Sequence, residues 1–368
     1  MRVLQIITRV NRGGTAKWIE VLAEGLRESE IENYVAAGRV SKNELEDPVF
    51  TLIGGVSIDH LTNSINPLGD LKAFLETRRL IKRYQPDIVN THTSKAGVIG
   101  RIATLSLFRN RPVLIHTFHG HLLYGYFNPW ILKSIVWVEK ILAKYTKVLI
   151  ASGEVVRDEL LAAGVGKLDQ FVIAKPGISS PVFKNKSEAR ALLGIDSQSV
   201  VVGWLGRMVP IKRPDRVIEL AKSNPGLTFV MAGGGELQDS IKLKAPLNVK
   251  VIGWSTPEIV WGASDIALLT SDNEAQPISL IEAGFAGLPS VALNVGAVAE
   301  VILDGFSGFV VEEIEGLSLA IRKLQNSTKL RKTLGENART RITTEFNVSG
   351  FIDAHLNSYA NALRLIEK

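Results

Sequence analysis

The sequence contains no cysteine among its 368 residues, which excludes disulfide bonds, thiolate metal sites and a cysteine nucleophile. It has no apolar run near the roughly 20 residues that a membrane-spanning helix needs. Residues 1–14 begin with one arginine and a short apolar run before polar residues, and this pattern predicts a first strand rather than a signal peptide. We therefore expect a cytoplasmic protein that is attached, at most, to the inner face of the cell membrane.

The positive charge is uneven. Residues 1–178 hold 23 Lys and Arg against 17 Asp and Glu, whereas the remaining residues hold 20 of each, so the formal charge of +6 falls in the first half. A basic surface can attract nucleic acid, anionic lipid head groups or a diphosphate-bearing substrate, or it can simply be solvated. No helix-turn-helix, zinc-finger or aromatic RNA-binding signature accompanies the charge, so we expect no nucleic-acid partner.

Short apolar runs bounded by turn residues alternate with amphipathic stretches, which is typical of doubly wound parallel sheets in the α/β class. The first half predicts strands at residues 3–7, 34–37, 87–91, 113–118, 148–151 and 171–174. The second half predicts strands at residues 200–205, 228–232, 249–253, 266–270, 290–293 and 309–311. Each set is enough for a complete Rossmann-like domain.

A domain boundary is expected where proline, glycine and serine interrupt the periodicity in residues 175–181. The two predicted domains are residues 1–178 and residues 179–349. Apolar residues recur at helical spacing in residues 351–366, and they predict a closing helix, at about residues 350–368, that packs back on the first domain.

Two basic or glycine-rich loops follow predicted strands. Gly13 and Gly14 stand between the first strand and an amphipathic helix, where glycine lets the backbone approach an anion at a helix N-terminus, although a plain tight turn has the same pattern. The full G-x-G-x-x-G fingerprint is missing, which disfavours a dehydrogenase. In the second domain, Arg207 ends a strand and Lys212 follows five residues later. Together they can hold a diphosphate, and the alternative is a solvated basic loop.

Two glutamates, Glu274 and Glu282, flank a predicted strand-to-helix turn in the second domain. Each carboxylate can accept hydrogen bonds from two sugar hydroxyls. The N–H groups around Gln276, Ile278 and Ser279 can face a phosphate or a hydroxyl at the start of the helix. Glutamates at this interval often occur by chance, so the spacing alone does not identify a function.

The remaining candidates lie in residues 116–147. His116, His119 and His121 could form a metal cluster, but His116 would face away from the other two along a strand and no carboxylate lies nearby, so no metal site is expected. His119 could also be a structural histidine. Residues 122–147 combine aromatic residues with four lysines, which fits either a segment that rests on an anionic membrane or a core helix with a solvated lysine face.

The order of the motifs resembles the retaining GT-B glycosyltransferases of family 4, especially bacterial members that build polysaccharide on lipid carriers. The match covers nearly the whole chain. It rests on Gly13-Gly14, residues 91–97 and 116–121, Gly206-Arg207-x4-Lys212, residues 232–235, Glu274-x7-Glu282 and residues 286–290. Ala275-Gln276 and residues 233–236 depart from the usual family pattern, and the first departure leaves the donor sugar open.

The resemblance implies two Rossmann-like domains that face each other across a cleft, with residues 1–178 on the acceptor side and residues 179–349 on the donor side. It also implies roles for individual residues. Arg207 and Lys212 would hold the donor diphosphate, Glu282 the ribose and Glu274 the sugar hydroxyls, while Gly14 would lie near the phosphates and His119 would point toward the sugar. The donor-binding residues expected on this basis are Gly13, Gly14, Gly206, Arg207, Lys212, Gly234, Glu274, Gln276, Pro277, Ile278, Ser279 and Glu282. Arg207, Lys212, Glu274 and His119 are the expected catalytic residues.

The expected reaction is transfer of a sugar from a nucleoside diphosphate donor, a UDP-sugar, to a hydroxyl of a glycan or a polyprenyl-diphosphate-linked saccharide, with retention. No Asp-x-Asp site follows a predicted strand, so no obligatory metal or other cofactor is expected. One alternative is a GT-B epimerase or hydrolase that acts on a UDP-sugar. Another, from a different class, is a non-catalytic nucleotide-binding Rossmann protein.

Overall fold

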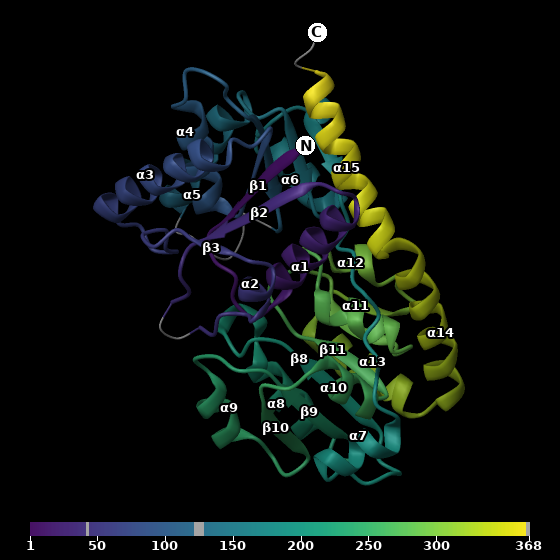
Figure 1. The fold of residues 1–368 in the computed structure, drawn as a ribbon. Coiled ribbons are helices and arrows are strands. Elements are labelled where there is room, and N and C mark those ends of the chain that lie inside the picture. Colours follow the sequence, from purple (N-terminus) through teal and green to yellow (C-terminus); the bar gives the residue numbers. More distant parts are fainter. Residues whose placement is uncertain (42–43, 121–128, 366–368) are drawn as a thin grey trace. The chain divides into compact units, whose positions relative to one another are not determined.

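The computed structural model describes residues 1–41, 44–120 and 129–365. The chain divides into two compact units (Figure 1). The first consists of Met1–Gly177 with Val348–Lys368, and the second of Ile178–Asn347. Each unit contains its own parallel sheet.

The first unit has a seven-stranded parallel sheet in the order β3-β2-β1-β4-β5-β6-β7. Its inner strands are almost entirely buried, because helices cover both faces of such a sheet and favour continuous apolar runs. The strands are β1 (Arg2–Ile7), β2 (Glu32–Ala37), β3 (Val56–Ser57), β4 (Ile88–His92), β5 (Val113–Phe118), β6 (Val148–Ala151) and β7 (Phe171–Ile173).

Helices alternate with these strands, and the C-terminal helix joins the same unit. They are α1 (Gly14–Glu28), α2 (Val49–Leu52), α3 (Pro67–Tyr84), α4 (Ser94–Leu105), α5 (Pro129–Ala143), α6 (Glu154–Ala162) and α15 (Val348–Arg364). The Asn66 side chain caps α3 by accepting a hydrogen bond from the Gly69 N–H. Helix α15 packs closely on α1, since a Cβ on Gly25 would lie 2.2 Å from the Ile352 side chain.

The second unit has a six-stranded parallel sheet in the order β10-β9-β8-β11-β12-β13. The strands are β8 (Val201–Leu205), β9 (Thr228–Ala232), β10 (Val249–Gly253), β11 (Ile266–Leu269), β12 (Ser290–Leu293) and β13 (Gly308–Val311). The helices are α7 (Lys186–Leu193), α8 (Pro214–Ser223), α9 (Gln238–Lys244), α10 (Pro257–Ala263), α11 (Ile278–Phe285), α12 (Val298–Val301), α13 (Ile314–Gln325) and α14 (Thr328–Glu345).

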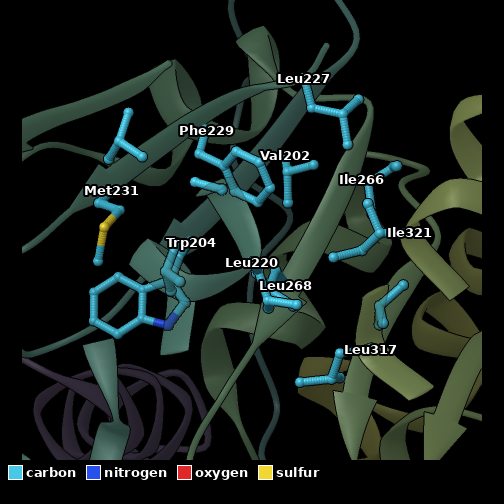
Figure 2. Close-up of a cluster of buried hydrophobic side chains, with 14 of the residues drawn as sticks. Val202, Trp204, Leu220, Leu227, Phe229, Met231, Ile266, Leu268, Leu317 and Ile321 are labelled. Atoms are coloured by element: carbon cyan, nitrogen blue, oxygen red, sulfur yellow. The ribbon is translucent and has the colours of Figure 1, made fainter. Parts of the chain in front are cut away.

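A cluster of buried side chains between this sheet and helices α8 and α13 makes a core of the second unit (Figure 2). Trp204 of β8 and Phe229 of β9 are its largest members, and both are almost fully buried. The Trp204 Nε1–H donates to the Thr270 hydroxyl at 3.0 Å. This bond satisfies the only polar atom of the indole and ties the core to the loop that follows β11.

Both sheets have a central pair of parallel strands, β1 with β4 and β8 with β11, and the strand order proceeds from this pair toward opposite edges of the sheet. At such a switch point the loops at the carboxyl ends of the two central strands diverge, and α/β proteins bind ligands there. The glycine-rich, basic and acidic loops identified in the sequence follow β1, β8, β9 and β11. The fold therefore gathers the candidates of each unit at one edge of its sheet.

The doubly wound class and the twelve predicted strands are confirmed, with ends that differ by one or two residues. The predicted strand 266–270 ends at Leu269, because the Thr270 carbonyl accepts from the Arg216 side chain instead of continuing the ladder. Strand β3 was not predicted, since two residues are too few to show alternation. The closing helix runs from Val348 to Arg364, and residues 366–368 lie outside the described part of the chain.

Candidate active site

The loops after β8 and β9 are joined through their backbones. The Gly206 N–H donates to the Ala232 carbonyl at 3.0 Å, and the Met208 N–H donates to the Gly234 carbonyl at 2.8 Å. Gly233 has φ +128°, and a Cβ there would lie 1.9 Å from the Gly206 carbonyl oxygen. Only glycine fits this close approach. The contact brings the predicted residues Gly206 and Gly234 together, with Arg207 next in the chain.

Lys212 and Glu274, two predicted site residues on different loops, form an ion pair. The Lys212 Nζ lies 2.5 Å from Glu274 Oε1, and the Ser271 hydroxyl donates to the same oxygen at 2.6 Å. The Glu274 side chain is 8% exposed and that of Lys212 is 24% exposed. A cation suited to phosphate thus touches a carboxylate suited to sugar hydroxyls, which matches a ligand in which a sugar is bonded directly to a phosphate.

Further hydrogen bonds fix the two loops that carry this pair. The Thr270 hydroxyl donates to the Lys212 carbonyl at 3.0 Å, and the Asp272 N–H donates to the Ile211 carbonyl at 2.9 Å. Arg216 binds both the Thr270 carbonyl and the Asp272 carboxylate. The position of the lysine is therefore set by the neighbouring loop as well as by its own.

The segment from Glu274 to Glu282 passes from a loop into helix α11. The Glu274 carbonyl accepts from the Ala297 N–H at 2.9 Å, and Pro277 stands immediately before the helix. Ile278 and Ser279 belong to the first turn, where backbone N–H groups have no partner within the helix. Glu282 is 3% exposed on the same helix. This confirms the expected location of the first glutamate in the loop and of the second in the helix.

Gln276 is held in one orientation beside this loop. Its Nε2 donates to Glu300 Oε2 at 2.6 Å, and its Oε1 has no hydrogen-bond partner within the described chain. The side chain is 8% exposed. A buried amide oxygen without a partner is costly, and a ligand hydroxyl or an ordered water can supply the missing donor.

Trp254 also belongs to this edge of the sheet, and the sequence analysis did not select it. It follows β10 directly and is 44% exposed. A Cβ on Gly234 would lie 2.3 Å from its Nε1, so the indole packs directly on the glycine loop. The feature of the sequence that could have identified Trp254 is an aromatic residue at the carboxyl end of a strand. A partly exposed indole can stack on a planar ligand such as a nucleobase.

Gly13, Gly14 and His119 lie in the first unit, at the carboxyl ends of β1 and β5. Gly13 precedes helix α1 with φ +149°, and nothing lies within 4 Å of a Cβ built there. Its backbone is open to a ligand at the N-terminus of a helix of 15 residues.

His119 is part of a group of aromatic and histidine side chains. Its Nε2 lies 2.8 Å from His92 Nδ1, and its ring makes a T-shaped contact with the Trp18 ring at a centroid distance of 4.7 Å. Burial, with a smaller contribution from His355, lowers the pKa of His119 to about 3. The ring is therefore neutral at neutral pH.

The other histidines of the predicted cluster have different surroundings. His116 Nδ1 lies 2.8 Å from the Thr91 hydroxyl, and burial lowers the pKa of His116 well below its ordinary value. His121 lies outside the described residues. Within residues 1–41, 44–120 and 129–365, no three His, Asp or Glu side chains are grouped as metal ligands.

Helix α5 covers residues 129–143 of the aromatic and basic segment, of which residues 122–128 lie outside the described chain. Trp130 and Trp137 are 76% and 64% exposed. With Lys133 and Lys140 they follow a spacing of three and four residues, so aromatic and basic side chains alternate along one face of the helix. The opposite face is anchored by Glu139, which is buried and pairs with Arg101 at 2.6 Å.

Two family models match the chain. The Glycosyltransferase Family 4 model matches residues 12–179, and the Glycosyl transferases group 1 model matches residues 185–341. Between them they take in most of the chain, and they meet close to the division between its two units.

Relatives and solved structures agree with these matches. The chain is 29% identical, over 80% of each chain, to the Escherichia coli UDP-Gal:alpha-D-GlcNAc-diphosphoundecaprenol alpha-1,3-galactosyltransferase. It is 24% identical, over 76% of this chain and 77% of the relative, to the capsular polysaccharide biosynthesis glycosyltransferase CapM of Staphylococcus aureus. Its fold is similar to Anabaena HepE in complex with UDP and glucose, with a TM-score of 0.83, 21% identity, and coverage of 98% of this chain and 100% of that one.

Proposed function

This chain belongs to the glycosyltransferases of GT-B architecture, and from that premise we propose that it moves a sugar from a UDP-sugar to a hydroxyl of a glycan or a polyprenyl-diphosphate-linked saccharide. The Escherichia coli relative acts, by its name, on a UDP-sugar and a diphosphoundecaprenol-linked sugar, which supports both substrate classes. In this proposal the second unit binds the donor and the first unit binds the acceptor, and Gly14 and His119 of the first unit also contact substrate.

The contact between Lys212 and Glu274 carries the proposal. Cleavage of the bond between sugar and diphosphate develops negative charge on the departing phosphate and positive charge on the sugar ring. Lys212, with Arg207, is suited to the first charge, and Glu274 to the sugar hydroxyls. Their charged atoms lie 2.5 Å apart, so a phosphate held by Lys212 and a sugar held by Glu274 would meet at the scissile bond.

In this proposal Trp254 and Glu282 hold the nucleoside. The Trp254 indole, packed on Gly234, offers a face for the uracil ring. The Glu282 carboxylate, buried on α11, offers an acceptor for the ribose hydroxyls. Gln276, Pro277, Ile278 and Ser279 complete the donor site in this proposal, with the free N–H groups of the first turn of α11 directed at the donor.

We propose retention of the anomeric configuration, on the basis of the family resemblance. In the proposed step, the acceptor hydroxyl approaches the face from which the phosphate departs. Its oxygen bonds to the anomeric carbon, the bond from that carbon to the phosphate oxygen breaks, and the hydroxyl proton passes to a phosphate oxygen. No side-chain nucleophile is required. NMR of the anomeric proton in the product tests this stereochemistry, and an inverted product would refute it.

The diphosphate charge is, in this proposal, balanced by Arg207, Lys212 and backbone N–H groups, without an obligatory divalent cation or other cofactor. Turnover should therefore be unchanged by EDTA. Loss of turnover in EDTA, with recovery on adding Mg²⁺ or Mn²⁺, would show that a metal is needed.

A lipid-linked acceptor requires access to a membrane surface, and we propose that helix α5 provides it. None of the described helices is both long and apolar enough to cross a bilayer. The exposed face with Trp130, Lys133, Trp137 and Lys140 combines aromatic area with positive charge, which suits an anionic lipid surface. Replacing Trp130 and Trp137 by Ser should reduce sedimentation with vesicles of anionic phospholipid, and Phe108→Ser, at a site 97% exposed, is the control.

The first experiment is a thermal-shift screen with UDP, GDP, ADP and NAD, followed by product analysis with UDP-sugars and a lipid-linked sugar acceptor. Stabilisation by UDP and transfer that depends on the acceptor would support the proposal. A nucleotide-linked or free sugar formed without acceptor would indicate an epimerase or a hydrolase, and binding without turnover a non-catalytic nucleotide-binding protein. Glu274→Gln should abolish transfer, whereas Glu219→Gln, at an exposed glutamate of the same unit, should not.

A further inference from the structure

A chain of buried polar side chains extends from His119 across the first unit. His92 Nδ1 lies 2.8 Å from His119 Nε2, and His92 Nε2 lies 2.8 Å from Gln5 Oε1. Gln5 and His92 are 0% exposed. The Gln5 amide continues to Asn33 of β2 and to Tyr359 of α15. The proposed reaction uses only His119 of these side chains, whereas Gln5, His92 and Tyr359 are fully buried and have no part in it.

The orientation of the Gln5 amide follows from its other contacts. Its nitrogen lies 3.2 Å from Asn33 Oδ1 and 3.1 Å from the Tyr359 hydroxyl. An amide nitrogen has two hydrogens to donate, and these two oxygens accept them, which leaves the Gln5 oxygen facing His92. If the Gln5 amide alone were flipped by exchanging its nitrogen and oxygen, its oxygen would lie 3.2 Å from the Asn33 oxygen with no hydrogen between them. If both amides were flipped, every donor in this network would be reversed, and the ¹H–¹⁵N spectra described below distinguish the two arrangements.

This orientation determines the hydrogens of both imidazoles. The Gln5 oxygen can only accept, so His92 carries its hydrogen on Nε2. The Nδ1 of neutral His92 is then an acceptor, and His119 must donate to it from Nε2. The Nδ1 of His119 then carries no hydrogen, and its lone pair can accept a hydrogen bond.

Both rings are neutral, which the deduction requires. Burial lowers the pKa of His92 well below its ordinary value and that of His119 to about 3. The titratable groups around His119 are His92 on β4, His116 on β5 and His355 on α15, and the uncharged Trp18 ring of α1 makes a T-shaped contact with it. The neighbouring histidines favour the neutral form of each ring.

We propose that Gln5 and His92 are positioning residues, which hold His119 in the tautomer with hydrogen on Nε2 so that its Nδ1 accepts a hydrogen bond from a hydroxyl of the bound sugar. The tautomer follows from the buried chain, and the identity of the hydroxyl rests on the proposed function. In this arrangement His119 orients the sugar and does not act as a general acid. The positioning reaches back to α15 through Tyr359.

The tautomer can be observed directly in the unmodified protein. Long-range ¹H–¹⁵N spectra of the full chain, labelled at histidine nitrogens, distinguish a protonated ring nitrogen from one with a lone pair, and His119→Gln identifies the signals of His119. We expect a protonated Nε2 and a bare Nδ1 on His119 and the same pattern on His92. The opposite pattern, or averaged signals on either ring, would overturn the proposal. This measurement needs neither substrate nor turnover.

Variants at His92 test whether the hydrogen bonds among Gln5, His92 and His119 affect the reaction. His92→Leu removes the acceptor for His119 and should lower kcat/KM by about 10- to 100-fold, while the affinity for UDP alone is unchanged. His92→Asn should recover most of that loss, because its side-chain oxygen can replace Nδ1. His60→Asn, at a partly exposed histidine of the same unit, is the matched control.

The two kinds of failure are distinguishable. Equal activity losses in His92→Leu and His92→Asn, or no loss in either, would overturn the positioning role. If the unmodified protein turns over no UDP-sugar, the proposed function fails, and the spectrum of His119 still decides the tautomer. Should His92→Leu not fold, the spectrum of the unmodified protein still decides the tautomer, and the opposite pattern overturns the proposal.

Discussion

The ion pair between Lys212 and Glu274 allows a prediction of size as well as direction. Exposed ion pairs contribute about 0–1 kcal/mol, whereas removing one partner of a buried pair costs about 3–5 kcal/mol. With Glu274 8% exposed and Lys212 24% exposed, this pair lies between those limits. We expect Lys212→Met to lower the free energy of unfolding by about 2 kcal/mol, since it leaves a nearly buried carboxylate without its cation. For a unit of this size, that corresponds to about 4–8 °C in Tm.

A double-mutant cycle isolates the pair. Glu274→Gln should cost less than Lys212→Met, at about 1 kcal/mol, because the lysine that it leaves is the more exposed partner and can be solvated. The variant with both changes should be more stable than the two single losses predict, by about 1–2 kcal/mol. Urea and thermal unfolding of the four proteins give the coupling, and Lys222→Met, at an exposed lysine of α8, should stay within about 0.5 kcal/mol of the parent.

A coupling energy of zero would refute the predicted stabilisation of Lys212 and Glu274 by each other. Equal stability of Lys212→Met and Lys222→Met would also refute it, because the carboxylate would then be solvated rather than paired. Both site variants should also lose transfer activity. Stability and activity report on different consequences of the same contact, so the cycle remains informative even if the donor is not a UDP-sugar.

Three further outcomes follow from the structure. Gly233→Ala should destabilise the second unit by about 3 kcal/mol or more and weaken UDP binding in titration calorimetry, because its Cβ would meet the Gly206 carbonyl oxygen in a backbone conformation that disfavours alanine. Glu139→Gln should cost about 3–5 kcal/mol in urea unfolding, because it leaves the buried Arg101 without its counter-charge; a loss under 1 kcal/mol would contradict this. Acidification should destabilise the first unit as pH falls from about 6.5 toward 3, by up to about 1.4 kcal/mol per pH unit for each buried histidine, because the unfolded chain takes up protons that the folded chain does not. Urea unfolding at pH 7 and pH 5 measures this slope. The slope should be shallower in His355→Gln, because burial lowers the pKa of His355 to about 4 in the folded parent protein and the variant lacks this group.

Much of the fold could be predicted from local patterns. The buried strands are short apolar runs that end at glycine or polar residues, so twelve of them could be placed within one or two residues. Strand β3, with two residues, was too short to be detected. The site loops could be located because they follow strands, and parallel strands present their carboxyl ends at one edge of a sheet.

Contacts between those loops could not be predicted. Trp254 was overlooked because it belongs to no recognised motif, and its packing on Gly234 depends on β9 and β10 being neighbours in the sheet. The unpaired oxygen of Gln276 could not be predicted either, because the Gln276 amide meets Glu300, 24 residues away. In each case the partner is distant in sequence, and local spacing contains no information about it.

The sequence by itself determined the fold class, the order of the motifs and the strand end at which each chemical group stands, because these depend on short-range periodicity and on the residues that break it. Only the tertiary structure decided which groups touch. Lys212 meets Glu274, 62 residues away, because β8 pairs with β11, and Gln5 meets Tyr359, 354 residues away, because α15 returns to the first unit. Charge neutralisation and hydrogen-bond direction act over a few ångströms, so the chemistry of both groups depends on strand order and helix docking.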